Sequence, residues 1–388
     1  MLDAAQALAL LARAPGGQRL LAVLGDHPEA RLVGGAVRDL LRGTIPTECD
    51  LVVEGEPLAV AEAIGTVAAE HPRFGVVIAS SGELRCDVVG ARRERYPEPG
   101  SLPEVEPASL EEDLMRRDFT VNAIALGADG VLHSADGALA DLRDGRLRVL
   151  HERSFRDDPT RLWRLVRYAV RFGFLPEPET DRWAHEAVAA GALSTVSRER
   201  LTAELRLALV EPSPLDVLHA AQNLGLTEGL VLDPVVTAAA VNLVDGHGST
   251  ALTILGSCLA DSNWSDAFAF PAAERRILDR CAAIAPLGTV PPLRPSDVDR
   301  SLAGEPVEAV AVAGARGSSA AARLWLGDWR RRAPAIDGDS LKAAGVPEGR
   351  DVGIALAAVR DALLDGELPP DADAGTQIAY ALAALADL

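Results

Sequence analysis

The chain has 388 residues, of which 48% are hydrophobic and 4% aromatic, and its formal net charge at pH 7 is −19. This length predicts two or more domains with ample core. No apolar run reaches the roughly 18 residues that cross a bilayer, and residues 1–17 carry an early acid and no basic leading segment. A membrane span and a signal peptide are therefore not expected.

The charge is unevenly distributed. Residues 85–171 contain fifteen arginines and sixteen acids, so the rest of the chain carries nearly all of the excess negative charge. The basic residues are almost all arginine, which favours bidentate contacts with phosphates, and Lys342 is the single lysine. The composition thus neither excludes a nucleic-acid partner nor requires one.

The four cysteines, at positions 49, 86, 258 and 281, are scattered without a Cys-x-x-Cys pair. This pattern argues against a zinc site or a disulfide framework and is typical of reduced thiols, so we expect a cytoplasmic protein. Cys49 and Cys86 are expected to face the core of the sheet.

A pair of glycines follows the first predicted strand, at residues 31–33. Gly34 and Gly35 let backbone N–H groups approach a phosphate closely. The helix predicted at 37–41, with Arg38 and Asp39 in its first turn, adds the positive end of its dipole. The stretch predicts a phosphate-binding turn, although a glycine pair by itself is usually only a turn.

Two acids stand at the entry of a buried strand. Glu48 and Asp50 are two residues apart, so both carboxylates point to one face of the strand at 51–53. Mg²⁺ typically binds through one or two carboxylates together with substrate phosphates. The spacing therefore favours a metal site, and the alternative is a solvated strand end.

The run Gly-Gly-Ala-Val-Arg-Asp, followed by acid-x-acid and a hydrophobic strand, resembles the signature of the nucleotidyltransferase superfamily. More closely, it is similar to bacterial tRNA nucleotidyltransferases (CCA-adding enzymes) and their poly(A) polymerase relatives. The family pattern is Asp-x-Asp, and Glu48 replaces its first acid here. The resemblance implies that Glu48, Asp50 and Asp87 are catalytic ligands of Mg²⁺, and that Gly34, Gly35 and Arg38 bind the nucleotide.

Asp87 lies inside the second strand of a predicted pair, 74–79 and 84–89, joined by a turn at 80–82. The alternative to its metal role is an edge-strand acid that faces solvent. The following run ARRERY is similar to a family element, and its arginines either contact RNA phosphates or form a surface ion-pair patch. We further expect two short helices in 1–30, a helix at 56–70 and a mobile loop at 96–109.

Residues 111–125 resemble the ribose-reading element of the family. There the resemblance implies that Asp118 accepts a hydrogen bond from the ribose 2′-OH, and that Arg117 holds the triphosphate. Asn122 is four residues beyond Asp118 and is expected on the same helical face. The alternative is an ordinary capped surface helix.

Residues 132–150 resemble the hinge element of the family, with Ser134 where the usual pattern has an acid.

A stripe of arginines marks the helix expected after Pro159. Arginines recur at i, i+3, i+6 and i+10 along one face, while leucine, valine and alanine occupy the other. Asp158 suits the N-cap position. The stripe consists of Arg161, Arg164, Arg167 and Arg171.

The start of this helix is similar to the family's acid-Asp-x-x-Arg element, with Asp157 where Glu is usual. The resemblance implies that Asp158 and Arg161 hydrogen-bond the edge of the incoming C or A, whose acceptors and exocyclic amine they match. Arg164 and Arg167 are then expected to face the triphosphate or the RNA backbone. The alternative is a solvated arginine face.

Residues 197–212 and 214–226 are amphipathic and resemble the family's neck, and beyond about 235 no motif is found. The predicted fold class is α+β, with a mixed β-sheet nucleotidyltransferase head followed by an all-α neck, body and tail. The predicted domains are 1–150, 151–232 and 233–388.

The predicted reaction adds C, A or both to the 3′ end of tRNA from CTP and ATP, by attack of a 3′-hydroxyl on the α-phosphorus. CC-only, A-only and poly(A)-adding relatives share these motifs. A non-catalytic tRNA-binding protein that kept the fold is the alternative outside enzymes. The sequence does not indicate the oligomeric state.

Overall fold

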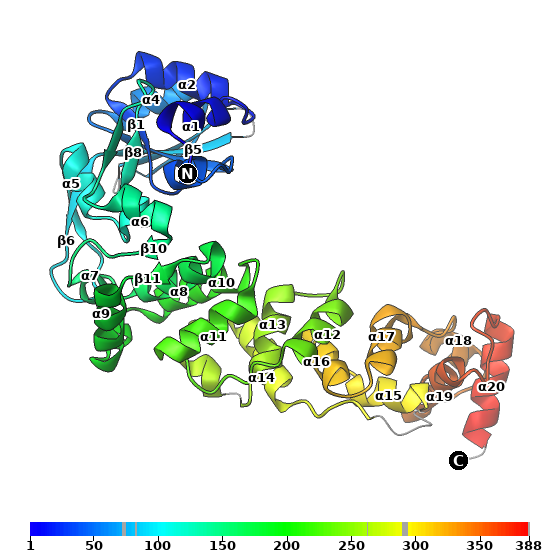
Figure 1. Ribbon diagram of the computed structural model, residues 1–388. Helices are drawn as coiled ribbons and strands as arrows, with labels where there is room; N and C mark the ends of the chain where they lie inside the picture. The colour runs from blue at the N-terminus through cyan, green and yellow to red at the C-terminus, as the bar shows by residue number, and fades with distance from the viewer. Residues whose placement is uncertain (72–74, 82–83, 262, 289–293, 387–388) are drawn as a thin grey trace. The chain divides into compact units, whose positions relative to one another are not determined.

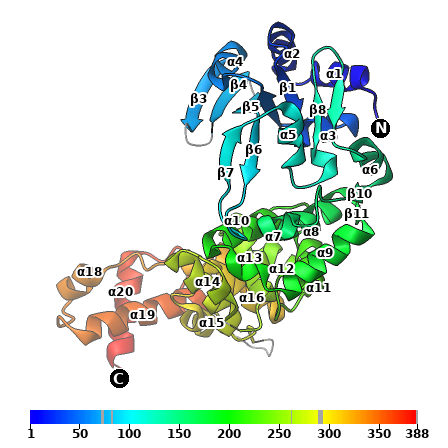
Figure 2. The same ribbon diagram turned by 90° about the vertical axis from the view of Figure 1, so that its left-hand side faces the viewer.

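The computed structural model describes residues 1–388 except 72–74, 82–83, 262, 289–293 and 387–388 (Figures 1 and 2). The chain divides into two compact units, Met1–Thr227 and Glu228–Leu388. In the part of the chain that is described, every helix is too short or too polar to span a bilayer.

A mixed sheet organises the first unit. Its strands are β1 (Ala30–Val33), β2 (Glu48–Val53), β3 (Thr66–His71), β4 (Val76–Ser81), β5 (Leu84–Gly90), β8 (Ile124–Leu126) and β9 (Leu132–Ser134). The order across the sheet is β3-β4-β5-β2-β1-β8-β9. The neighbouring strands are antiparallel, except that β2 and β5 run parallel.

Four helices lie before β3 in the chain: α1 (Ala4–Leu11), α2 (Gly17–Asp26), α3 (Gly35–Leu41) and α4 (Pro57–Ile64). Helices α3 and α4 pack on the strands, and α1 and α2 pack against these two helices (Figure 2). Alternation along β2 and β5 turns Cys49 and Cys86 into the core, where both are fully buried, as the sequence predicts. The acids next to them therefore lie on the opposite face.

Two segments before residue 110 differ from the sequence-based expectation. The helix predicted at 56–70 ends at Ile64, because Gly65 stops it and the β-branched residues that follow begin β3, which pairs with β4. The loop predicted at 96–109 contains β7 (Glu104–Pro107), which pairs with β6 (Arg92–Arg95) in the ribbon visible in Figure 2. Phe74 and Gly82, from the predicted strand pair and its turn, lie outside the described residues.

The rest of the first unit is mostly helical. It comprises α5 (Leu110–Met115), η2 (Thr120–Asn122), α6 (Ala138–Asp144), β10 (Arg146–Leu147), α7 (Ser154–Asp157), α8 (Thr160–Phe172), β11 (Leu175–Pro176), α9 (Pro178–Ala189), η3 (Ala192–Thr195), α10 (Arg198–Leu209) and α11 (Pro214–Leu224). Helix α8 buries Leu162, Trp163 and Leu165 and packs against α10 and α11. The helix predicted over 111–125 stops at Met115, so Asp118 and Asn122 do not share a helical face.

The second unit is built of helices around its own cores. They are α12 (Pro234–Val244), α13 (Thr250–Cys258), η4 (Asn263–Ala267), α14 (Ala272–Ala283), α15 (Pro295–Leu302), α16 (Val307–Arg316), α17 (Ser319–Gly327), η5 (Trp329–Arg331), α18 (Gly338–Ala343), α19 (Arg350–Asp365) and α20 (Ala374–Ala386). One core gathers around Trp325 and Trp329, and another joins α18, α19 and α20. A mixed-sheet head followed by helices is the fold class that the sequence predicts.

Candidate active site

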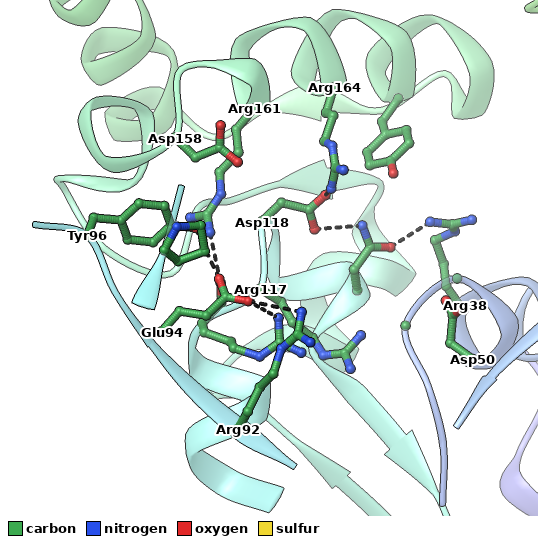
Figure 3. A pocket seen from close by; sticks show the side chains of 16 residues that line it. Arg38, Asp50, Arg92, Glu94, Tyr96, Arg117, Asp118, Asp158, Arg161 and Arg164 are labelled. Atoms are coloured by element: carbon green, nitrogen blue, oxygen red, sulfur yellow. Dashed lines mark hydrogen bonds and ion pairs between the residues drawn. The ribbon is translucent and has the colours of Figure 1, made fainter. Parts of the chain in front are cut away.

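A polar cleft of about 410 Å³ lies within the first unit, beside the sheet and under helix α8 (Figure 3). Ten residues predicted to bind nucleotide or metal line it, from segments more than a hundred residues apart in the chain. They are Gly34, Gly35, Arg38, Asp50, Arg117, Asp118, Asn122, Asp158, Arg161 and Arg164. The remaining three predicted residues, Glu48, Asp87 and Arg167, are not in the lining.

The turn between β1 and α3 depends on glycine. Gly34 has a φ of +66°, a region that favours glycine. A Cβ there would lie 2.8 Å from a guanidinium nitrogen of Arg117 and 3.6 Å from an Asp50 carboxylate oxygen. The backbone thus passes close to both side chains, and a larger residue would displace Arg117.

Arg38 is fixed at this end of the cleft. Its side chain is buried, donates to Asp39 and to the Asn122 Oδ1 at 2.5 Å, and stacks on the Phe172 ring with the guanidinium carbon 4.3 Å from the centroid. The Arg38 guanidinium is thus fixed in position before any ligand binds.

The acids on β2 and β5 come from neighbouring parallel strands, in a register that places Asp50 opposite Asp87 and Glu48 opposite Arg85. Arg85 contacts Asp87 at 3.2 Å and Glu48 at 3.5 Å, and the Glu48 side chain is two-thirds exposed. Although the Asp50 backbone is part of the sheet, its carboxylate accepts no hydrogen bond from the residues that the structure describes. The pKa of the Asp50 carboxyl is raised, mainly because the surrounding protein desolvates it. Arg117 lowers this pKa, whereas repulsion from Asp87 and Glu48 raises it further.

This donor set fits a divalent cation, because Asp50 is crowded by two further carboxylates and lacks a donor of its own. No group of three or more His, Cys, Asp or Glu side chains is arranged to hold a metal among the residues that the structure covers. Asp50 and Asp87 stand opposite each other on neighbouring strands, and the roles of Asp50, Asp87 and Glu48 as metal ligands stay a prediction.

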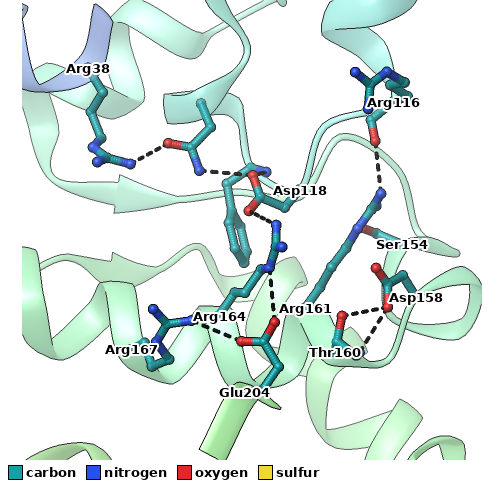
Figure 4. Close-up of polar contacts among 12 residues, drawn as sticks. Arg38, Arg116, Asp118, Ser154, Asp158, Thr160, Arg161, Arg164, Arg167 and Glu204 are labelled. Carbon is teal, nitrogen blue, oxygen red and sulfur yellow. Dashed lines mark hydrogen bonds and ion pairs between the residues drawn. The ribbon is translucent and has the colours of Figure 1, made fainter. Parts of the chain in front are cut away.

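Asp118 occupies the middle of the cleft in a network of donors (Figure 4). Its Oδ1 accepts from the Asn122 side chain at 2.9 Å and the Phe119 amide at 2.8 Å, and its Oδ2 contacts Arg164 at 3.3 Å. Burial alone would raise the pKa of this carboxyl, but Arg164 and the hydrogen bonds outweigh it and lower the pKa. Asp118 is therefore held as a charged acceptor.

Asp113 is a residue that sequence reasoning missed. It is fully buried on α5 and accepts from Arg116 at 2.7 Å and from Arg117 at 2.8 Å, two arginines that line the cleft. Burial opposes the charge, but the two arginines prevail and lower the pKa of Asp113. The signal was present in the sequence, because the arginines stand three and four residues after Asp113 on one helical face.

Asp158 and Arg161 line the far end of the cleft. The Arg161 guanidinium donates to the Ser154 hydroxyl at 2.6 Å and to the Arg116 carbonyl at 2.8 Å. Asp158 accepts from Thr160 and from Arg200, at 2.8 Å, through Oδ1 alone. Its Oδ2 thus lacks a hydrogen bond from described residues and remains available to a ligand.

The arginine stripe of α8 divides into two parts. Arg164 reaches the cleft, whereas Arg167 is buried and bonds Glu204 at 2.9 Å and Glu211 at 3.0 Å (Figure 4). Arg171 likewise bonds Glu211. The predicted orientation of Arg167 toward nucleotide or RNA differs from its observed one, since acids on α10 and just beyond it take up its charge.

The exposed arginines of β6 form ion pairs across the ribbon. Arg93 bonds Glu106 at 2.7 Å and Arg95 bonds Glu104 at 2.6 Å. Of the two interpretations of this run, the structure thus displays the surface ion-pair patch.

Comparison with known proteins agrees with this architecture. Residues 30–148 match the family model described as the poly A polymerase head domain. The chain is 40% identical over 210 residues to an A-adding tRNA nucleotidyltransferase of Aquifex aeolicus, covering 52% of this chain and 26% of the relative. It is 42% identical over 199 residues to a CC-adding tRNA nucleotidyltransferase of Deinococcus radiodurans, covering 49% and 52%.

The fold resembles a solved CCA-adding enzyme in its apo form, with a TM-score of 0.80, 27% identity and coverage of 98% of this chain and 99% of the other. The matched stretch spans about half or less of the length of the two relatives named above.

The mixed sheet and its cleft fall mainly in the stretch that matches a poly A polymerase head domain, and helices follow it. Residues 30–148 match the poly A polymerase head-domain family, and the chain is similar to A-adding and CC-adding tRNA nucleotidyltransferases and to a solved CCA-adding enzyme. Members of this family generally use a divalent metal ion.

Proposed function

We propose that the protein adds C, A or both to the 3′ end of tRNA, with CTP and ATP as donors and no nucleic-acid template. In this reaction a terminal 3′-hydroxyl attacks the α-phosphorus of the nucleotide, and pyrophosphate leaves. The relatives named as A-adding, CC-adding and CCA-adding enzymes support the choice of substrate class.

The observation that carries the proposal is the order of groups along one cleft. Asp158 and Arg161 lie at one end, Asp118 in the middle, and Arg38 and Asp50 at the other end (Figure 3). A nucleoside triphosphate has the same order of base, ribose and phosphates. One extended ligand would therefore meet every group.

Each side chain has a role in this proposal. The free Oδ2 of Asp158 and the Arg161 guanidinium match the amine and acceptors shared by the edges of C and A. Asp118 accepts the ribose 2′-OH, and Asn122 and Arg164 hold it in place. Arg38 and Arg117, beside the turn at Gly34 and Gly35, bind the phosphates. Arg167 is left out, because its charge is already paired.

We propose Mg²⁺ as the metal, held by Asp50 and Asp87 with Glu48 as a further ligand. When bound, such an ion would favour ionisation of the attacking hydroxyl and offset the charge of the triphosphate. We assign 1–150 to the catalytic head, 151–232 to a neck with base-selecting and RNA-binding elements, and 233–388 to a body and tail. The four unpaired cysteines suit a reducing compartment, and we propose the cytoplasm.

The test uses three tRNA transcripts, ending at the discriminator base, at C and at CC, each incubated with labelled CTP or ATP in Mg²⁺. CCA addition extends the first two with CTP and the third with ATP. A CC-adding enzyme leaves the third transcript unextended, an A-adding enzyme extends the third alone, and a poly(A)-adding enzyme gives a ladder. Binding of tRNA without any incorporation would refute the proposal in favour of a non-catalytic protein.

A further inference from the structure

The two aromatic rings in the lining of the cleft occupy different positions. Tyr168 lies near the phosphate-binding end, edge-on to Phe119 and 5.6 Å from the Arg38 guanidinium carbon. Tyr96 lies at the opposite end, on the side where Figure 3 shows Asp158 and Arg161. Nearly all other side chains of the lining are charged or polar, so Tyr96 is the flat apolar surface at the base-reading end.

The Tyr96 ring is held in place by its hydroxyl, which donates to the Glu94 carboxylate at 3.0 Å. The Glu94 side chain is 8% exposed and is itself fixed by Arg116 at 2.7 Å and Arg92 at 3.3 Å. Burial raises the pKa of Tyr96, so the hydroxyl stays a donor across the physiological range. The ring therefore has a defined position before any ligand binds.

The segment after Tyr96 is hydrogen-bonded to the end of helix α7, which Asp158 directly follows. The Gly100 amide donates to the Asp157 carbonyl at 3.2 Å, and the Gly100 carbonyl accepts from Arg200 at 2.7 Å. Arg200 also holds Asp158 at 2.8 Å. Gly100 has a φ of +73°, and a Cβ there would lie 2.2 Å from the Thr195 hydroxyl oxygen. Arg200 thus contacts both the segment that follows Tyr96 and the Asp158 carboxylate.

We propose that Tyr96 is the stacking platform for the nucleobase of CTP or ATP, while Asp158 and Arg161 read the edge of that base. This inference rests on the proposed function. In-plane hydrogen bonds leave both faces of a base uncovered, and an aromatic ring covers one face without distinguishing pyrimidine from purine. A platform of this kind suits a site that takes both C and A.

The alternative is that Tyr96 only anchors its segment through Glu94. Two substitutions separate the ring from the hydroxyl. Tyr96→Gln removes the ring and keeps a donor for Glu94, whereas Tyr96→Phe keeps the ring and removes the donor. Tyr380→Gln in the second unit is a matched control, because the Tyr380 hydroxyl also donates to a glutamate, Glu367, at 2.5 Å.

The experiment measures binding of CTP, ATP and inorganic tripolyphosphate to the full chain by calorimetry in Mg²⁺, with thermal unfolding as a check of the fold. Tyr96→Gln is expected to weaken CTP and ATP binding about 5- to 150-fold and to leave tripolyphosphate binding within twofold. Tyr96→Phe is expected to retain most of the nucleotide affinity, and Tyr380→Gln to match the parent.

Equal nucleotide affinity in Tyr96→Gln and the parent would overturn the platform while leaving the proposed function intact. So would a parallel loss of tripolyphosphate binding, or a loss in Tyr96→Phe as large as in Tyr96→Gln, because either result marks an anchoring role. Failure of the parent chain itself to bind CTP and ATP would instead overturn the proposed function, and the platform with it.

Discussion

Asp118 and Arg164 form an ion pair of 3.3 Å that joins the segment after α5 to helix α8. The Asp118 side chain is 7% exposed and that of Arg164 is 42% exposed, so the pair lies at the wall of the cleft with one partner reaching solvent. Arg164 also contacts Glu204 at 3.5 Å. The proposed ribose acceptor is therefore positioned by a residue of the neck.

The first prediction concerns this pair. Asp118→Asn and Arg164→Gln are each expected to lower kcat/KM for CTP and ATP and to reduce the preference for CTP over dCTP. In the double variant, the loss of transition-state free energy derived from kcat/KM is expected to be smaller than the sum of the two single losses, with a coupling of about 0.5–3 kcal/mol. The reason is that either single change already breaks the ion pair. Steady-state kinetics with all four proteins measures this coupling, and strictly additive effects would disprove the pairing in solution.

The second prediction concerns Asp113 and stability. Asp113→Asn is expected to lower the free energy of unfolding at pH 7 by about 3 kcal/mol, because it leaves two partly buried arginines, Arg116 and Arg117, without their anion. Urea unfolding of parent and variant measures the difference. Because Arg117 lies against Gly34, nucleotide affinity is expected to fall in the same variant.

The pH dependence of this difference follows from the lowered pKa of Asp113. A depressed carboxyl pKa contributes stability above the unfolded-state value of about 3.9, and the contribution is lost as pH falls through the folded-state pKa. The difference in unfolding free energy between parent and Asp113→Asn is thus expected to be constant above about pH 5 and to become smaller below about pH 4. A gap that persists unchanged into stronger acid would contradict the assignment.

The third prediction concerns the buried network behind the cleft. Glu211 has a side chain that is 1% exposed and bonds both Arg167 and Arg171. Glu211→Gln is expected to destabilise the first unit by about 1–3 kcal/mol, because a buried carboxylate that joins two arginines is lost and Arg167 keeps Glu204 alone. Glu186→Gln breaks the exposed pair with Arg182 and serves as the matched control, with a change within about 1 kcal/mol. Equal effects in the two variants would show that the network does not hold the neck together.

Local features of the fold were predictable where a residue type limits the backbone. Gly34 marks the turn because its positive φ and the closeness of Arg117 exclude a side chain. Alternation along two strands predicted the buried cysteines at 49 and 86. Short-range pattern and side-chain size were sufficient in these places.

Partners from distant parts of the chain were not predictable. Arg164 and Arg167 both belong to the arginine stripe of α8. Arg167 bonds Glu204 and Glu211, about forty residues further along the chain, whereas Arg164 reaches the cleft. Periodicity shows that two arginines share a face, but it does not show which acids cover that face. The strand at 66–71 was missed for a related reason, since its pairing with β4 decides its conformation.

Under the proposed function, Asp50 is essential to a Mg²⁺-dependent transfer of nucleotide to tRNA. The most direct measurement is incorporation of labelled CTP and ATP into tRNA by Asp50→Ala over a Mg²⁺ titration, with the exposed Asp144→Ala as control and thermal unfolding as a check. We predict that Asp50→Ala folds normally and loses about 100-fold or more of its rate at every Mg²⁺ concentration, while Asp144→Ala keeps the parent rate. Parent-like incorporation by Asp50→Ala would rule out an essential role of Asp50 in the transfer.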